Sequence, residues 1–312
     1  MKINKIFAMI ALGALFCGCD QKLPYDLEGT EHGVVISISK VPGSDGVLST
    51  DINSGNYKVR LDVPVYQGDY SMLEDAQIMA VYTGVDKTKK SAIVAEGIKA
   101  FPAEVDIDIK GVVAKLGISG IEVGDRIEYT PCYTLKSGTQ VNGWSELGGF
   151  NNTNFTPWKL ADGSSVSYRV SYKAYAPLQI NKFQGDAVPF EMEGGDTGVM
   201  KVTQVEDKPA ADWIPAGTTA ADLVGLKFEG DFWFWPDSFM IWINTLDYSV
   251  IIPDQVIYPE FEYPGLGAHD AYIVECYGEI DTLFNTLTFY FNTAWGDYSH
   301  GVFGNDVVTF TF

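Results

Sequence analysis

The segment from Phe232 to Trp242 holds the residues best suited to contacting a ligand, because tryptophans occupy three of its positions. Its pattern predicts a β-hairpin that turns at Pro236-Asp237-Ser238. Alternate side chains of a strand share a face, so Trp233 and Trp235 should project together. Flat indole rings suit the apolar face of a sugar ring. If a sugar stacks on them, Asp231, Asp237 or Asn244 could accept hydrogen bonds from its hydroxyl groups. If the indoles are exposed, they form an aromatic platform for a glycan; if they are buried, they are core.

A second aromatic group, Trp295-Gly296-Asp297-Tyr298-Ser299-His300, precedes the last strand-like segment. It combines aromatic rings with a carboxylate and an imidazole. We expect Trp295 and Tyr298 to border the same ligand surface, and an ordinary aromatic loop is the alternative.

The acidic segment Glu104-Val105-Asp106-Ile107-Asp108 suggests hydrolysis as a remote alternative. Acids at alternate strand positions share a face, and a carboxylate pair is what glycoside cleavage requires. The segment resembles the Glu-x-Asp-x-Glu strand motif of laminarinase-type glycosidases, but Asp108 replaces the final Glu. Asp108 is also expected to cap a helix. We therefore expect no enzymatic activity.

Two further groups bear on ions and disulfides. Asp51-Ile52-Asn53-Ser54-Gly55-Asn56 places oxygen ligands at alternate positions, as calcium sites do, but no closing Glu follows. A β-turn is expected there, with a structural calcium ion as the alternative and no other cofactor. Cys132 and Cys276 are expected to be single thiols rather than a disulfide, although an oxidising compartment would permit one.

The N-terminus has the parts of an export signal, with Lys2 and Lys5 before an apolar run from Ile6 to Phe16. The run is too short to span a membrane, which takes about 20 residues. The residues Phe16-Cys17-Gly18-Cys19 then resemble a bacterial lipobox. The resemblance implies cleavage after residue 18, and a diacylglyceryl thioether and an acylated amine on Cys19.

Residues 19–33 form an acidic tether that resembles the export tag of surface lipoproteins in Bacteroidota-type bacteria. The resemblance implies an outer-membrane protein on the cell surface, and retention at the inner membrane is the alternative. The net charge of −20 argues against nucleic acid, whose phosphates require a basic surface.

The rest of the chain must position these residues, and its short alternating segments and frequent turns predict an all-β fold. We expect two tandem β-sandwich domains, Ig-like or related, at 34–176 and 177–312, with one or two short helices. One helix is expected over 109–116 with Gly117 as its left-handed stop, and one helical turn after Thr219. The expected strands are 34–39, 57–65, 76–83, 91–98, 126–135, 166–175, 227–234, 239–244, 271–277, 286–292 and 307–312.

Taken together, the lipobox, the acidic tag, the β pattern and the tryptophan-rich hairpin resemble the surface glycan-binding lipoproteins of starch-utilisation-type systems. This resemblance implies non-catalytic binding of a polysaccharide through aromatic platforms, with an outer-membrane transporter as a further candidate partner. A structural or adhesive lipoprotein that binds another protein is the alternative, and it predicts that the indoles are buried.

Overall fold

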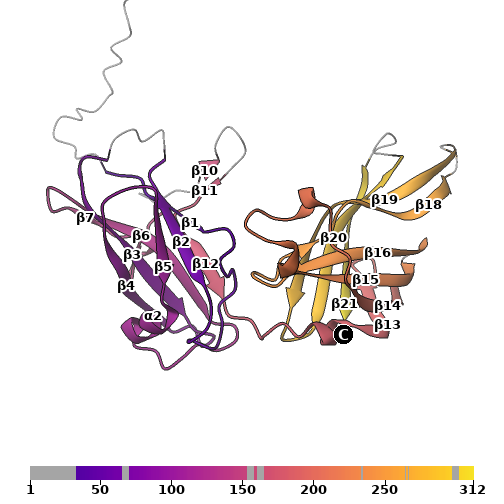
Figure 1. Cartoon of the computed structure of the whole chain (residues 1–312), viewed down its shortest axis with the longest axis horizontal. Coiled ribbons are helices and arrows are strands. Elements are labelled where there is room, and N and C mark those ends of the chain that lie inside the picture. Colours follow the sequence, from indigo (N-terminus) through magenta and orange to yellow (C-terminus); the bar gives the residue numbers. More distant parts are fainter. Residues whose placement is uncertain are drawn as a thin grey trace, which may run out of the picture. The chain divides into compact units, whose positions relative to one another are not determined.

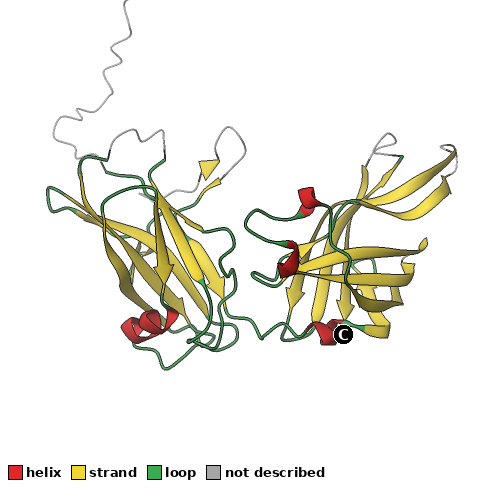
Figure 2. Cartoon of the chain, viewed as in Figure 1, coloured by secondary structure: helices red, strands yellow, loops and turns green. Residues whose placement is uncertain are grey.

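The computed structural model describes residues 33–64, 70–152, 158–159, 165–232, 235–263, 265, 267–296 and 302–312. Strands dominate these residues, which confirms the all-β prediction (Figure 2). The export signal, Cys19 and the acidic tether lie outside the described residues. Within the part of the chain that is described, no helix is long and apolar enough to cross a membrane.

The first half of the chain forms two sheets, coloured indigo to magenta in Figure 1. The smaller sheet has the order β1 (Ser37–Lys40), β2 (Tyr57–Asp62), β5 (Ala103–Ile107). The larger sheet has the order β12 (Val170–Lys173), β6 (Arg126–Leu135), β3 (Leu73–Thr83), β4 (Lys89–Ile98), and β7 (Gln140–Val141) also pairs with β6. Two short hairpins follow β7, and their strands are β8 (Trp144–Ser145), β9 (Gly149–Phe150), β10 (Trp158–Lys159) and β11 (Ser165–Val166).

One hydrophobic core joins these two sheets into a sandwich. Ile38 and Val59 of the smaller sheet belong to the same buried cluster as Ile78 and Tyr129 of the larger sheet. Tyr172 on β12 lies edge-on to Tyr129, with ring centroids 5.7 Å apart. The alternation predicted from the sequence therefore buries one face of each sheet.

The predicted helix is present as α2 (Ile109–Leu116), and Gly117 ends it with a φ of 62°. Its buried residues are Ile109, Val112, Val113 and Leu116, so the helix covers part of the same core. Asp108 occupies the N-cap position, but its side chain makes no capping hydrogen bond. The prediction was therefore right about the helix ends and wrong about the bond.

The second half of the chain forms a closed eight-stranded barrel instead of the predicted second sandwich. The first strand, β13 (Gly185–Met192), pairs with the last, β21 (Val302–Thr311). A bridge between β17 (Val250–Ile251) and β19 (Gly267–Asp281) closes the other gap. The other strands of the ring are β14 (Thr197–Val205), β15 (Leu223–Phe232), β16 (Trp235–Asn244) and β20 (Thr286–Trp295). A ninth strand, β18 (Gln255–Tyr263), pairs with β19 outside the closed ring. Three 3₁₀ turns accompany them, namely Ile180–Phe183, Ala211–Trp213 and Ala220–Asp222, the last being the predicted turn after Thr219.

Phenylalanine side chains fill the middle of the barrel. Phe228 stacks on Phe239 with ring centroids 4.7 Å apart, and Phe310 lies 4.8 Å from Phe228. Phe289 completes the group at 5.4 Å from Phe310. An eight-stranded barrel is narrow enough for side chains to fill, and these rings make this part of it a packed core.

The two hydrophobic cores share no residue, since the first draws on residues 34–174 and the second on residues 183–310. The proposed domain boundary after Ala176 lies between them and stays a prediction.

Candidate functional site

Trp242 is buried, which corrects the prediction that its indole ring forms part of an exposed aromatic platform. Its side chain is only 7% exposed, and its indole N–H donates to the backbone oxygen of Asp207 at 2.8 Å. Trp242 lies opposite Gly225 on β15, where a Cβ atom would come within 3.1 Å of the indole nitrogen. The segment that follows β14 therefore covers Trp242 on the barrel wall.

Trp295 is also buried, at 8% exposure. Its ring stacks on Phe261 of β18, with centroids 5.3 Å apart and an interplanar angle of 15°. Ala271 of β19, which pairs with Trp295 of β20, is fully buried. Trp295 thus belongs to the barrel core rather than to an exposed surface.

The other predicted platform residues lie in parts of the chain whose side chains are not described. Trp233 and Tyr298 fall outside the described residues. Trp235 and Asp237 belong to β16 by their backbone, paired with Phe232 and Gly230. Their exposure stays a prediction.

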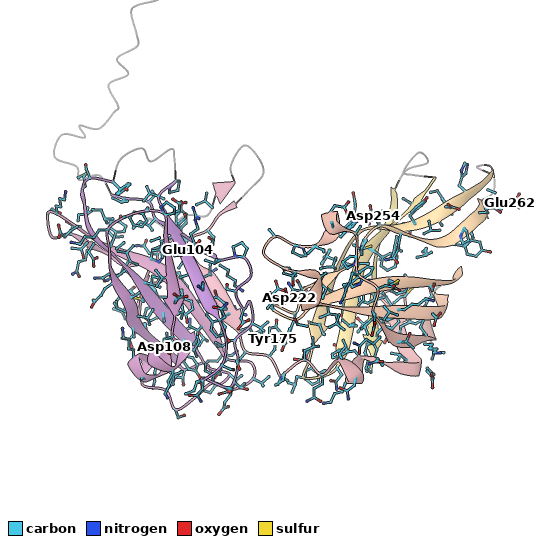
Figure 3. The ribbon with its side chains drawn as sticks, viewed as in Figure 1. Glu104, Asp108, Tyr175, Asp222, Asp254 and Glu262 are labelled. Atoms are coloured by element: carbon cyan, nitrogen blue, oxygen red, sulfur yellow. The ribbon has the colours of Figure 1, made fainter. Side chains whose placement is uncertain are left out.

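The acids considered for hydrolysis are exposed side chains in ion pairs. Glu104 (Figure 3) and Asp106 have side chains that are 55% and 81% exposed. Lys58 contacts Asp106 at 3.0 Å, and Arg60 lies 3.9 Å from Glu104. Both acids therefore make cross-strand ion pairs between β2 and β5.

The segment Asp51–Asn56 is a turn, as predicted, in which one carboxylate oxygen of Asp51 accepts hydrogen bonds from the backbone and side chain of Asn53 at 3.0 and 3.2 Å. Among the described residues, no group of three or more His, Cys, Asp or Glu side chains is placed to hold a metal ion. Cys132 and Cys276 are both free thiols, as predicted.

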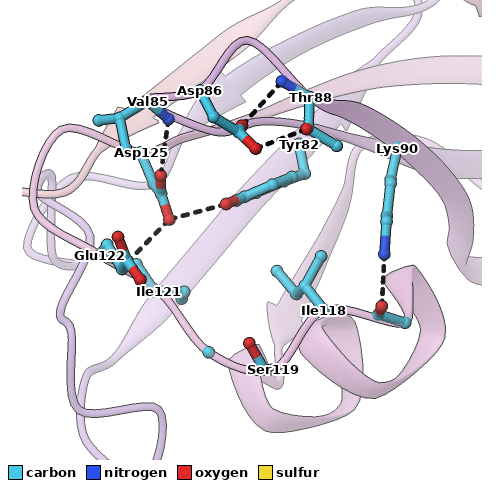
Figure 4. Close-up of a pocket in the computed structure, with 12 residues that line it drawn as sticks. Tyr82, Val85, Asp86, Thr88, Lys90, Ile118, Ser119, Ile121, Glu122 and Asp125 are labelled. Carbon is cyan, nitrogen blue, oxygen red and sulfur yellow. Dashed lines mark hydrogen bonds between the residues drawn. The ribbon is translucent and has the colours of Figure 1, made fainter.

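A pocket of about 680 Å³ lies between the β3–β4 turn and the loop after α2 (Figure 4). Its central acid is Asp125, which is 1% exposed and accepts hydrogen bonds from the Tyr82 hydroxyl and from the backbone of Val85 and Glu122. Burial and the bond to Asp125 raise the pKa of Tyr82 to about 12. Lys90 donates to the carbonyl of Gly117 at the end of α2. These hydrogen bonds connect the end of β3, the β3–β4 turn and β4 to the segment after α2, so they give Tyr82, Asp125 and Lys90 a structural role.

An exposed aromatic pair does exist, on the outer wall of the barrel. Tyr277 on β19 is 55% exposed and stacks on Tyr290 of β20, with centroids 4.4 Å apart and an interplanar angle of 6°. Nearby charge is negative, because Glu279 is the main cause that raises the pKa of Tyr290. The pair presents one flat aromatic face beside a carboxylate.

The arrangement best built for a ligand is a pocket of about 330 Å³ against strands β6 and β12. We call it the arginine pocket. Its lining includes Arg126 and Glu128 from β6, Gly143 and Phe150 from the segment after β7, and Arg169 and Ser171 from the β12 region. This volume falls within the range of about 300–1,000 Å³ that is usual for small-molecule sites.

A charge pair forms the centre of the arginine pocket. Glu128 is 8% exposed, and its carboxylate lies 3.5 Å from the Nε atom of Arg169. The Arg169 guanidinium also lies 4.6 Å from the ring centroid of Phe150, as a cation–π contact. The pair thus presents an acceptor and a donor side by side, next to an aromatic ring.

The backbone after β7 fixes the floor of this pocket. Gly143 lies so close to β6 that a Cβ atom would overlap the hydroxyl of Thr130. The Gly143 N–H donates to the sulfur of Cys132 at 3.4 Å, and its carbonyl accepts from the Asn151 N–H at 2.8 Å. These bonds hold Phe150 above the outward face of β6.

Sequence reasoning missed this site because its charges are about forty residues apart in the chain. Antiparallel pairing places Ser171 opposite Glu128 and brings Arg169 diagonally next to it. The available signal was the alternation of Arg126 and Glu128 on a predicted strand.

No protein-family model matches this chain, and no curated protein or solved structure shows detectable similarity to it.

Proposed function

We propose that this chain is a lipid-anchored, non-catalytic glycan-binding protein of the cell surface, and that the arginine pocket holds the sugar. The observation that carries the proposal is the Glu128–Arg169 pair beside Phe150 in a concave site. A sugar combines hydroxyl groups, which both donate and accept hydrogen bonds, with an apolar C–H face. The pocket presents a partner for each of these features.

The burial of the Glu128 carboxylate favours a ligand that donates hydrogen bonds. A carboxylate that is mostly removed from water needs hydrogen-bond donors, because burying a charge is costly. Within the described residues, the salt bridge to Arg169 at 3.5 Å is its one charge contact. A hydroxyl group of a bound sugar would donate a hydrogen bond to the other carboxylate oxygen of Glu128. It would thereby replace the water that the sugar displaces from the pocket.

Native gels cast with a panel of polysaccharides test this proposal. We expect the mature protein to be retarded by at least one polysaccharide and the Glu128→Gln variant to lose most of that retardation. Glu104→Gln is the matched control, because Glu104 is also an acid facing an arginine but lies outside the arginine pocket. Equal retardation of both variants and the wild type would exclude the arginine pocket as the site, and no retardation by any polymer would reject glycan binding.

Contact with another protein is a second candidate, favoured by the turn between β19 and β20. Leu283 and Phe284 at this turn are 59% and 70% exposed. Exposed apolar side chains of this size are a common mark of protein interfaces. An outer-membrane transporter is the partner implied by the resemblance described above. The Phe284→Ser variant should no longer co-purify with that transporter from membranes, whereas the Glu128→Gln variant should still do so.

A further inference from the structure

Arg126 stands apart from the other two arginines of the chain. The sequence holds 3 arginines among 41 acidic residues. The paired ones are Arg60, with Asp62 and Glu104, and Arg169, with Glu128. Arg126 makes no salt bridge within the described residues and is exposed at the first position of β6. In so acidic a chain, a guanidinium without a carboxylate partner is available to an anionic group from outside.

The position of Arg126 directs that anionic group to the arginine pocket. Arg126 lines the pocket, and it shares the outward face of β6 with Glu128, two residues further on. Lys173 lies directly opposite Arg126 on β12. With Arg169, the outward face of these two strands therefore carries three cations and one carboxylate, whereas the whole chain has a net charge of −20.

We infer that the arginine pocket selects glycans bearing a carboxylate, such as a uronic acid, and that Arg126 holds that carboxylate. This specificity rests on the glycan binding proposed above and supplies its substrate class. The Glu128–Arg169 pair contacts the hydroxyls of the same sugar. Glu128 is neutralised by Arg169, so Arg126 is the uncompensated charge in the lining of the pocket.

The chemistry of arginine supports this assignment. A guanidinium presents two parallel N–H groups that match the two oxygens of a carboxylate, whereas a lysine offers a compact charge without that geometry. Screening limits charge effects at the protein surface to about 8 Å at physiological ionic strength. The acidic remainder of the chain therefore does not prevent an anionic sugar from binding at this local basic patch.

The test compares sugars that differ only in the carboxylate. Binding of methyl glucuronide and methyl glucoside, and of the corresponding galacturonide and galactoside, is measured by calorimetry on the mature protein. We expect the wild type to prefer the uronide of at least one pair by about tenfold or more, as a charge-assisted bidentate contact would give. Arg126→Gln should abolish the preference by weakening binding of the uronide.

Two further variants separate charge from geometry and from non-specific effects. Arg126→Lys should retain only part of the preference, because the charge remains but the planar fork is lost. Arg60→Gln is the matched control, as it removes an arginine from the smaller sheet and should keep the full preference. Circular dichroism confirms that each variant is folded.

Each contrary result has a distinct meaning. If the neutral sugar binds as tightly as the uronide, or if Arg126→Gln keeps the preference, the uronate specificity is rejected while glycan binding stands. If the wild type binds none of these sugars and no polysaccharide retards it in gels, both the specificity and the proposed function are rejected.

Discussion

Gly143 sets how closely the segment after β7 can approach strand β6. A side chain there would overlap the hydroxyl of Thr130 and the carbonyl of Pro131, and the latter cannot move without moving the strand. Gly143→Ala should therefore destabilise the fold by about 1–3 kcal/mol, the usual cost of overpacking. It should also weaken binding at the arginine pocket, because Phe150 depends on this contact.

Gly120→Ala is the matched control for Gly143, since no atom lies within 4 Å of the added Cβ. Urea unfolding measures both variants, and Gly120→Ala should stay within about 0.5 kcal/mol of the wild type. Equal stability of Gly143→Ala and the wild type would show that the two segments are less closely packed than described.

Cys276 should be a poorly reactive thiol. Burial, and then the charges of Asp254 and Glu275, raise its pKa to about 12. Only the thiolate is alkylated, and a higher pKa lowers the thiolate fraction at pH 8 more than it raises intrinsic nucleophilicity. Site-resolved mass spectrometry with iodoacetamide should show alkylation at least about tenfold slower than in the denaturant-unfolded chain, and faster as pH rises. The same rate in both states would contradict the described environment of Cys276.

Among the elements, strands β16 and β18 are joined by a side chain, that of Gln255, instead of by backbone pairing. The amide of Gln255 accepts from the Met240 N–H at 2.7 Å and donates to the Met240 carbonyl at 2.8 Å. It thus replaces two backbone hydrogen bonds of β16. Gln255→Leu should cost about 1–3 kcal/mol, because it leaves a part-buried donor and acceptor of Met240 unpaired.

The control for Gln255→Leu is Gln204→Leu, which changes an exposed glutamine on β14. Denaturant unfolding gives the stabilities, and hydrogen exchange of the Met240 amide should accelerate only in Gln255→Leu. An unchanged Met240 exchange rate would contradict the role given to Gln255.

Local patterns predicted elements well where neighbouring residues determine them. Both ends of β6 and of α2 follow from alternation and from Gly117. Strands β13, β14 and β18 were missed, because residues such as Pro189, Gly198 and Pro259 interrupt their patterns. Barrel closure also escaped prediction, since the pairing of β13 with β21 joins segments more than 100 residues apart and no local pattern specifies it.

For the whole molecule, the proposed lipid anchor on Cys19 leads to a separate prediction. Cys19→Ser should remove the acyl mass from the mature protein and release it from the membrane fraction, because several acyl chains are what make anchoring stable. Cys17→Ser is the matched control and should remain lipidated. Intact mass spectrometry and fractionation measure both, and a membrane-bound, unmodified Cys19→Ser protein would contradict lipidation at this residue.

The position of the candidate site could not be predicted from the sequence. Aromatic content suggested sugar binding, but Trp242 and Trp295 are buried, because aromatic residues in a closed barrel pack against its core or under its loops. The arginine pocket depends instead on the pairing of β6 with β12 and on a glycine contact after β7. Neither feature has a sequence motif, so the sequence could suggest a ligand class but could not suggest this pocket as the place where it binds.

The most direct test of glycan binding at the arginine pocket is amide hydrogen exchange, measured by mass spectrometry with and without the polysaccharide that retards the protein most. We expect slower exchange upon binding in residues 126–128, 140–152 and 167–173, with the rest of the described chain unchanged. Protection confined to residues 232–242, or to β19 and β20 around Tyr277 and Tyr290, would place the sugar on the barrel and contradict binding at the arginine pocket.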